Sequence, residues 1–307
     1  MLYIIVVILG MLVPIQTAAN ARLRVQTQSV WVVTLLSFSV STLTLLAACS
    51  AGGTPLLPVA EQLQAAPWWS WSGGLIALLS ITAYICLFRE LGTLQATILP
   101  IVGQLVFGLV IDHYGLFQAA QIELTPLRML AALLLLAGTT LAVAPPRRRD
   151  KQVGTSRSAV RTVALQMLGI GTGCLLASMG AIYGALGRAL GSAVQAALFS
   201  FASATAVMLL CCAAAGVAGL AIRAFAEPQP WWKWLGGLIG AMAVFGNAWI
   251  IPQLGAGVFF MLLTIGQILL SLCMERQGWL GAEKKRITCR QLIGLGVMLA
   301  GVALLRQ

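Results

Sequence analysis

The chain has 307 residues, of which 60% are hydrophobic and only 9% are charged, with a net charge of +11. A soluble globular domain carries about 25% charged residues, so this chain lacks the charge needed to cover a water-facing surface. The composition therefore excludes an ordinary soluble protein and predicts an all-α integral membrane protein.

Ten apolar runs follow one another along the chain, and each approaches the roughly 20 residues that a helix needs to cross a bilayer. The runs lack the alternation of period two that marks the strands of an outer-membrane barrel. We therefore predict ten transmembrane helices: Leu2–Thr17, Val30–Ala48, Trp71–Phe88, Leu94–Ile111, Leu127–Ala144, Ala164–Leu186, Ala193–Ala218, Trp234–Ile251, Ala256–Met274 and Leu292–Leu305.

The two halves of the chain are copies of one module. A shift of 163 positions aligns Pro67–Ile76 with Pro230–Ile239 without a gap, including the tryptophans and the glycine pair of each segment. Repeated apolar modules are typical of secondary transporters. We expect a first five-helix repeat over residues 1–144, a cytoplasmic basic linker over 145–163 and a second five-helix repeat over 164–307.

Five crossings in each repeat have a geometric consequence. After an odd number of crossings, the second repeat enters the membrane from the opposite face, so the sequence predicts two inverted repeats related by an axis in the membrane plane. Assigning alternate loops to opposite faces places 16 of the 19 Lys and Arg residues on one face and three on the other. By the positive-inside rule the first face is cytoplasmic, so both termini are predicted to be periplasmic.

The positive charge does not indicate a nucleic-acid partner. Its densest run, Arg147–Lys151, is short and has no aromatic interleaving, so it fits a topology anchor better than a nucleic-acid site. The expected partners are a small-molecule cargo and membrane lipid. Because both halves already share one chain, a monomer is the simplest functional unit.

A combination of short motifs resembles a known family. The motifs are Gly10, Gln16, Asn20 and Leu23, then Ser37-Phe38 with Thr42, then the Trp-Trp and Gly-Gly pairs, and then Gly103-Gln104 followed by Asp112. Together they are similar to the YdcZ-like five-helix family of the drug/metabolite transporter superfamily, in its fused two-repeat form and over nearly the whole chain. The resemblance implies that helices 1–4 and 6–9 surround a central cavity while helices 5 and 10 pack behind; it implies no particular cargo.

The candidate substrate residues are uncharged. All eight acidic residues lie at or beyond the ends of apolar runs, whereas relatives that expel cationic drugs carry a carboxylate inside the first helix. An amide or phenol facing lipid would be unsatisfied, so these groups are expected to face the bundle interior. We predict that seven of them line a substrate cavity: Gln16, Asn20, Tyr84, Gln104, Tyr183, Asn247 and Gln267. A bond to a neighbouring helix is the simpler explanation for any one of them, but their recurrence at equivalent positions favours the cavity.

Asp112 and Glu275 form another equivalent pair, at the ends of the fourth and ninth helices. A gate or coupling role is one interpretation; a solvated helix end or a partner for a nearby cation such as Arg276 is the other. His113 is the only histidine, and the seven cysteines show no paired spacing, so we predict no metal site and no cofactor.

Taken together, these patterns predict a bacterial inner-membrane transporter that moves a small neutral or amphipathic metabolite or drug outward by alternating access. The alternative is a non-transporting membrane assembly factor or accessory subunit, which would explain the missing coupling carboxylate. An enzyme is disfavoured because the sequence contains no catalytic triad pattern, phosphate loop or metal-ligand cluster. The sequence leaves the substrate, the coupling ion and the oligomeric state open.

Overall fold

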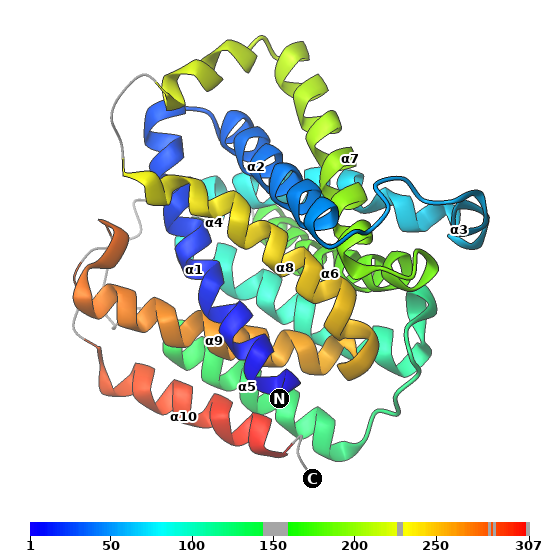
Figure 1. Cartoon of the computed structure of the whole chain (residues 1–307). Helices are drawn as coiled ribbons and strands as arrows, with labels where there is room; N and C mark the ends of the chain where they lie inside the picture. Colours follow the sequence, from blue (N-terminus) through cyan, green and yellow to red (C-terminus); the bar gives the residue numbers. More distant parts are fainter. Residues whose placement is uncertain (144–158, 226–229, 282–283, 285–286, 305–307) are drawn as a thin grey trace.

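A computed structural model of the chain describes residues 1–143, 159–225, 230–281, 284 and 287–304, and these residues form helices and no strand (Figure 1). Within one long helix, the side chains of residues 81, 84–86, 88–89 and 92–94 also lie outside the description. Most of the expected linker over 145–163 falls outside the described residues.

Among the described residues each repeat contributes five α-helices, all of them long except the six-residue α3. The first repeat contains α1 (Leu2–Thr27), α2 (Val30–Ala51), the short α3 (Ala60–Ala65), α4 (Gly73–Tyr114) and α5 (Pro126–Val143), with the 3-10 helices η1 (Trp68–Ser72) and η2 (Leu116–Gln118). The second contains α6 (Ala159–Ala189), α7 (Ala193–Ala214), α8 (Leu235–Leu254), α9 (Ala256–Gln277) and α10 (Cys289–Leu304), with η3 (Ala218–Ala224), η4 (Trp231–Trp234) and η5 (Trp279–Gly281).

Within the described part of the chain, eight helical segments are long and apolar enough to cross a membrane. The expected third and fourth spans form the single helix α4, of which the part Gln95–Tyr114 qualifies as a span; α10 is apolar but has only 16 residues. The two expected spans join because the residues between them, Arg89-Glu90-Leu91-Gly92, contain no proline and include three good helix formers. A total of ten crossings therefore stays a prediction.

Serine caps start the second helix of each repeat at equivalent positions. The hydroxyl oxygens of Ser29 and Ser192 accept hydrogen bonds from the backbone N–H three residues later, at 3.4 and 3.3 Å. The residues before them, Gln28 and Gly191, adopt left-handed backbone conformations with φ of 53° and 66°. A left-handed residue followed by a serine cap ends one helix and starts the next, which explains the two tight α1–α2 and α6–α7 turns.

The repeats interlock through reciprocal glycine contacts, in which α1 packs on α9 and α6 packs on α4. A Cβ atom added at any of four glycines would overlap a backbone carbonyl oxygen. Between α1 and α9, Gly10 meets the carbonyl of Leu263 and Gly266 meets that of Val7. Between α4 and α6, Gly103 meets the carbonyl of Ile170 and Gly173 meets that of Pro100. The two pairs of helices match under the shift of 163 positions, because the contact of Gly10 with Leu263 corresponds to that of Gly173 with Pro100. Glycine allows this close approach because it has no side chain.

Equivalent residues also contact each other where α2 meets α7. The rings of Phe38 and Phe201 pack edge to face with centroids 5.4 Å apart, and the hydroxyls of Thr42 and Thr205 are 3.0 Å apart. Contacts between equivalent residues are those that a twofold relation between two copies produces. The α2–α7 contact therefore lies at the centre of the interface between the repeats.

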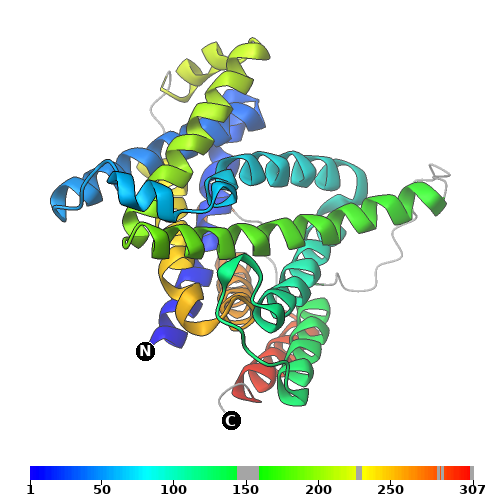
Figure 2. The same ribbon diagram turned by 90° about the vertical axis from the view of Figure 1, so that its right-hand side faces the viewer.

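Helices α5 and α10 lie side by side at one edge of the bundle (Figures 1 and 2). A Cβ at Gly138, late in α5, would lie 2.5 Å from the carbonyl oxygen of Gly294, early in α10; a Cβ at Gly301, late in α10, would lie 2.9 Å from the carbonyl oxygen of Ala131, early in α5. The two helices are thus antiparallel, and this pair also packs against α9, with α5 contacting α4 as well.

Two glycines of α6 provide a matched test of this packing. We expect Gly173→Ala to lower stability by about 1–3 kcal/mol, because the added methyl overlaps the Pro100 carbonyl. Gly171→Ala, two residues away, is expected to be neutral or stabilising by about 0.5–1 kcal/mol, because no other atom lies within 4 Å of the added methyl. Thermal unfolding of the purified variants measures both; equal effects at the two positions would contradict the α4–α6 contact.

Candidate functional site

A polar cluster lies where α1, α2 and α8 meet. The Oδ1 atom of Asn20 accepts a hydrogen bond from the Ser37 hydroxyl at 2.7 Å, and the Ser41 hydroxyl donates to the backbone carbonyl of Gly237 at 2.6 Å. A Cβ at Gly236 would overlap Asn20 Oδ1. The glycine pair of the repeat motif therefore lets α8 approach the polar side chains of α1 and α2.

Gln16 faces the same cluster from one turn earlier in α1. A Cβ at Gly240 would lie 3.2 Å from Gln16 Nε2 and 3.1 Å from the Ser41 hydroxyl. The structure thus brings the predicted residues Gln16 and Asn20 together. It adds Ser37 and Ser41, which the sequence analysis did not select; their spacing of four, on one face of α2, was the available signal.

The equivalent cluster of the second repeat is less polar. Tyr183, which corresponds to Asn20, is only 3% exposed and packs against Gly73 at the start of α4. Met179 and Ala204 stand where the first repeat has Gln16 and Ser41. The two repeats share a backbone arrangement here, but the hydrogen-bonding groups are concentrated in the cluster of α1, α2 and α8.

The remaining predicted residues are spread over α4, α8 and α9. Gln104, Asn247 and Gln267 are each half-buried, and no hydrogen bond joins them to another residue that the structure describes. The side chain of Tyr84 lies outside the described residues. The structure therefore does not gather all seven residues around one point, and their role as a substrate cavity stays a prediction.

Asp112 is a buried carboxylate that binds the start of another helix. Its side chain is 1% exposed, and its two oxygens accept hydrogen bonds from the backbone N–H groups of Ala256 and Gly257 at 2.6 and 2.9 Å. These are the first two residues of α9, whose N-terminus carries the positive end of the helix dipole. Gly255, with φ of 84°, separates α8 from α9 at this point.

The corresponding contact of Glu275 is not formed. Glu275 is half-buried, and no hydrogen bond or ion pair connects it with another part of the described chain. The position that matches Gly255 is Gly92, which lies inside the continuous helix α4. The two repeats therefore differ at this pair: one carboxylate holds a helix start, while its counterpart makes no such bond and the matching position of α4 lies in an unbroken helix.

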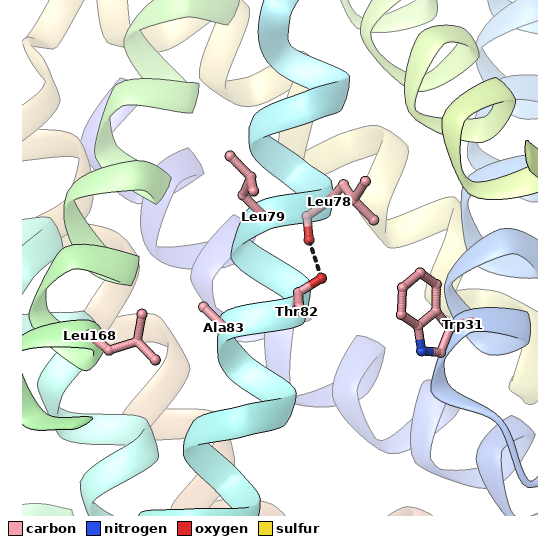
Figure 3. Close-up of a pocket in the computed structure, with 6 residues that line it drawn as sticks. All are labelled: Trp31, Leu78, Leu79, Thr82, Ala83 and Leu168. Carbon is pink, nitrogen blue, oxygen red and sulfur yellow. Dashed lines mark hydrogen bonds between the residues drawn. The ribbon is translucent and has the colours of Figure 1, made fainter. Parts of the chain in front are cut away.

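Two pockets lie elsewhere on the described structure. One, of about 370 Å³, is lined by Trp31, Leu78, Leu79, Thr82, Ala83 and Leu168 from α2, α4 and α6 (Figure 3). Its single hydroxyl is satisfied within α4, because Thr82 donates to the Leu78 carbonyl at 2.9 Å. The groove is otherwise apolar except for the indole N–H of Trp31, so it offers few polar groups to orient a cargo.

The second pocket, of about 300 Å³, lies at the turn between α6 and α7, against the end of α8. None of the seven predicted substrate residues lines either pocket.

Comparison with known proteins identifies the family. The family model described as "Putative inner membrane exporter, YdcZ" matches residues 1–141 and again residues 164–304, once for each repeat. The chain belongs to the YdcZ family. The double match confirms the resemblance to a fused, two-repeat YdcZ protein, and with the apolar helices it supports a multi-pass inner-membrane protein with a transport role rather than an enzyme.

The YdcZ chain is also similar to solved structures. One, titled only as the crystal structure of a protein, is 16% identical, covers 97% of each chain and has a TM-score of 0.60. At this identity the similarity concerns the fold alone. No curated protein matches the chain.

Proposed function

We propose that this YdcZ-family chain exports a small neutral or amphipathic metabolite or drug across the inner membrane by alternating access. The observation that carries the proposal is the reciprocal packing of the two repeats, in which each α1–α9 contact has an α6–α4 counterpart. Two copies packed in this way can exchange conformations, and such an exchange opens a central path to alternate sides.

The antiparallel packing of α5 and α10 supports inverted repeats. These helices are equivalent elements, so two copies that crossed the membrane in the same direction would not place them antiparallel. Inversion requires each repeat to cross an odd number of times, which the expected five crossings satisfy. The α2–α7 contact through Thr42 and Thr205 lies on the proposed axis.

The polar residues support an uncharged or amphipathic cargo. The cluster of Gln16, Asn20, Ser37 and Ser41 offers amides and hydroxyls and contains no carboxylate. Within this proposal, Gln104 and Gln267 extend the path along α4 and α9. Their amides have no hydrogen-bond partner among the described residues, which leaves them available to a cargo.

We further propose that Asp112 and Glu275 act as alternating gates. In the present conformation Asp112 holds the start of α9. When the repeats exchange conformations, α4 would break near Gly92 and Glu275 would bind the backbone N–H groups of residues 93 and 94. In an alternating mechanism only one of two equivalent gates is closed in any one state. The bound Asp112 and the unbound Glu275 fit that expectation.

Flux measurements test the proposal. Metabolite profiles of cells with and without the protein would name candidate cargoes, and uptake of each candidate into inside-out vesicles would measure transport directly. We expect at least one compound to accumulate only in vesicles that contain the protein. Absence of flux, together with capture of a stoichiometric membrane partner, would favour the alternative of an assembly factor or accessory subunit.

The orientation makes a separate prediction. A reporter fused after Gln307 is expected to lie in the periplasm, and a reporter inserted in the 145–163 linker is expected to lie in the cytoplasm, because 16 of the 19 basic residues then lie inside. Paired phosphatase and fluorescent-protein fusions report the two locations. The reverse pattern would overturn the orientation and leave the repeat packing intact.

A further inference from the structure

The second pocket combines a cation with an aromatic wall. Its side-chain lining consists of Arg188, Ser192, Ala193, Ala248, Trp249 and Pro252, together with two glycines. Its volume of about 300 Å³ lies at the lower end of the range for small-molecule sites. In the proposed orientation it opens on the periplasmic side.

The polar side of the pocket contains hydrogen-bond donors. Arg188 donates one bond through Nη2 to the backbone carbonyl of Gln118 at 2.7 Å, and a guanidinium has five N–H donors in total. The Ser192 hydroxyl oxygen accepts the Gln195 N–H at 3.3 Å, which leaves its own proton to donate. No carboxylate lines the pocket, and the ion pair of the described structure, Arg161 with Glu90, lies elsewhere.

The part of the pocket that α8 lines is apolar. Trp249 is 41% exposed, and its ring stacks on Phe245 with an interplanar angle of 15° and centroids 5.9 Å apart. Ala248 and Pro252 continue this wall along α8. The space at Gly191 is open, because a Cβ there would meet no atom within 4 Å.

These features match one ligand chemistry. A carboxylate accepts hydrogen bonds and donates none, and its bonds to a guanidinium are among the strongest in proteins. A flat ring fits against an indole face. We propose that this pocket binds an organic anion with an aromatic or apolar body and serves as the exit site for such a cargo.

The exit role rests on the proposed transport function, whereas binding of the anion does not. The first repeat does not carry the same pair of residues, because the positions equivalent to Arg188 and Trp249 are Val25 and Cys86. A single cationic site at one end of a twofold arrangement gives the two ends different affinities for the same anion.

Binding of a matched pair of probes tests the inference. The protein in nanodiscs of zwitterionic lipid is titrated with tritiated 1-naphthylacetate and with the neutral 1-naphthylacetamide. We expect the acid to bind about tenfold more tightly than the amide or better. Arg188→Gln should abolish this preference, Arg188→Lys should keep part of it, and Trp249→Ala should weaken both probes.

Arg128→Gln is the matched control, because it removes another of the three basic residues predicted on the same side and should keep the preference. Trp249→Ala leaves the Arg188–Gln118 bond in place, so it tests the pocket even if Arg188 variants fail to fold. Equal binding of acid and amide by the natural protein, or a preference that survives Arg188→Gln, would overturn the site.

Loss of probe binding in nanodiscs that contain phosphatidylglycerol would assign the pocket to a lipid headgroup and overturn the cargo role.

Flux separates this inference from the proposed function. If vesicles transport a neutral compound but the pocket shows no preference for the acid, the anion site is wrong and transport stands. If the acid binds through Arg188 but no compound is transported, the site stands and the transport function is wrong.

Discussion

Replacing Asp112 with asparagine is expected to release the start of α9 and to slow transport by an order of magnitude or more. The carboxylate accepts two short bonds from backbone N–H groups in a buried setting. Bonds to a charged group contribute roughly 1.5–3 kcal/mol each. The asparagine oxygen can accept only one of these bonds, and its NH₂ group would face the other backbone N–H. We therefore expect the free-energy difference between the open and closed states to shift by about 3 kcal/mol, which is over a hundredfold in the open-to-closed ratio.

Labelling of a buried cysteine measures this shift. In a variant whose seven native cysteines are replaced by alanine, Ala256→Cys places a thiol at the first residue of α9, which is fully buried. A membrane-impermeant maleimide should react slowly with this thiol when Asp112 is present and much faster in the Asp112→Asn background. The transport rate of the same Asp112→Asn change, without the added cysteine, is measured in vesicles.

Glu275→Gln is the matched control for the gate. In the present conformation Glu275 does not hold a helix start, so its replacement should leave the Ala256→Cys thiol protected. Under the exchange of conformations it should still slow transport, because the second state needs the carboxylate. Equal labelling in all three backgrounds would show that Asp112 is a helix cap without a gating role.

Much of this architecture follows from the sequence because the repeat encodes it. The shift of 163 positions that aligns Trp68 and Gly73 with Trp231 and Gly236 also relates Ser29 to Ser192, and the two serines cap equivalent helices. The apolar runs likewise locate eight of the ten expected spans. Local signals of this kind, such as apolar length, caps and repeated motifs, are legible before any tertiary contact is known.

The features that the sequence did not reveal are long-range or conformational. Asp112 binds N–H groups 144 and 145 residues away, and no local pattern at Asp112 indicates which helix start it meets. Ser41 reaches the Gly237 carbonyl across 196 positions. The sequence also did not reveal that α4 is continuous. Gly255 separates two helices, whereas the equivalent Gly92 lies inside one helix. The same residue type thus has two different conformations, and the residue type alone does not predict which one forms.

Alanine at both Gln104 and Gln267 is expected to reduce transport to the background of empty vesicles, and either change alone should reduce it about tenfold or more. The reason is that these amides lie at equivalent positions of α4 and α9, and no described residue uses their hydrogen-bonding groups. Because no such bond is lost, the thermal unfolding temperature should stay near that of the natural protein. If the amides bind cargo, their replacement should remove transport and leave the unfolding temperature unchanged. If they instead hold helices together, their replacement should lower the unfolding temperature as well.

Gln253→Ala is the matched control for these glutamines. Gln253 also lies on an apolar helix, but its Nε2 group donates to the Trp249 carbonyl of its own helix at 2.7 Å and it lines neither the polar cluster nor a pocket. Its replacement should leave the transport rate unchanged. Normal transport by the double variant Gln104→Ala, Gln267→Ala would remove these residues from the cargo path, and loss of transport together with a large fall in unfolding temperature would assign them to helix packing instead.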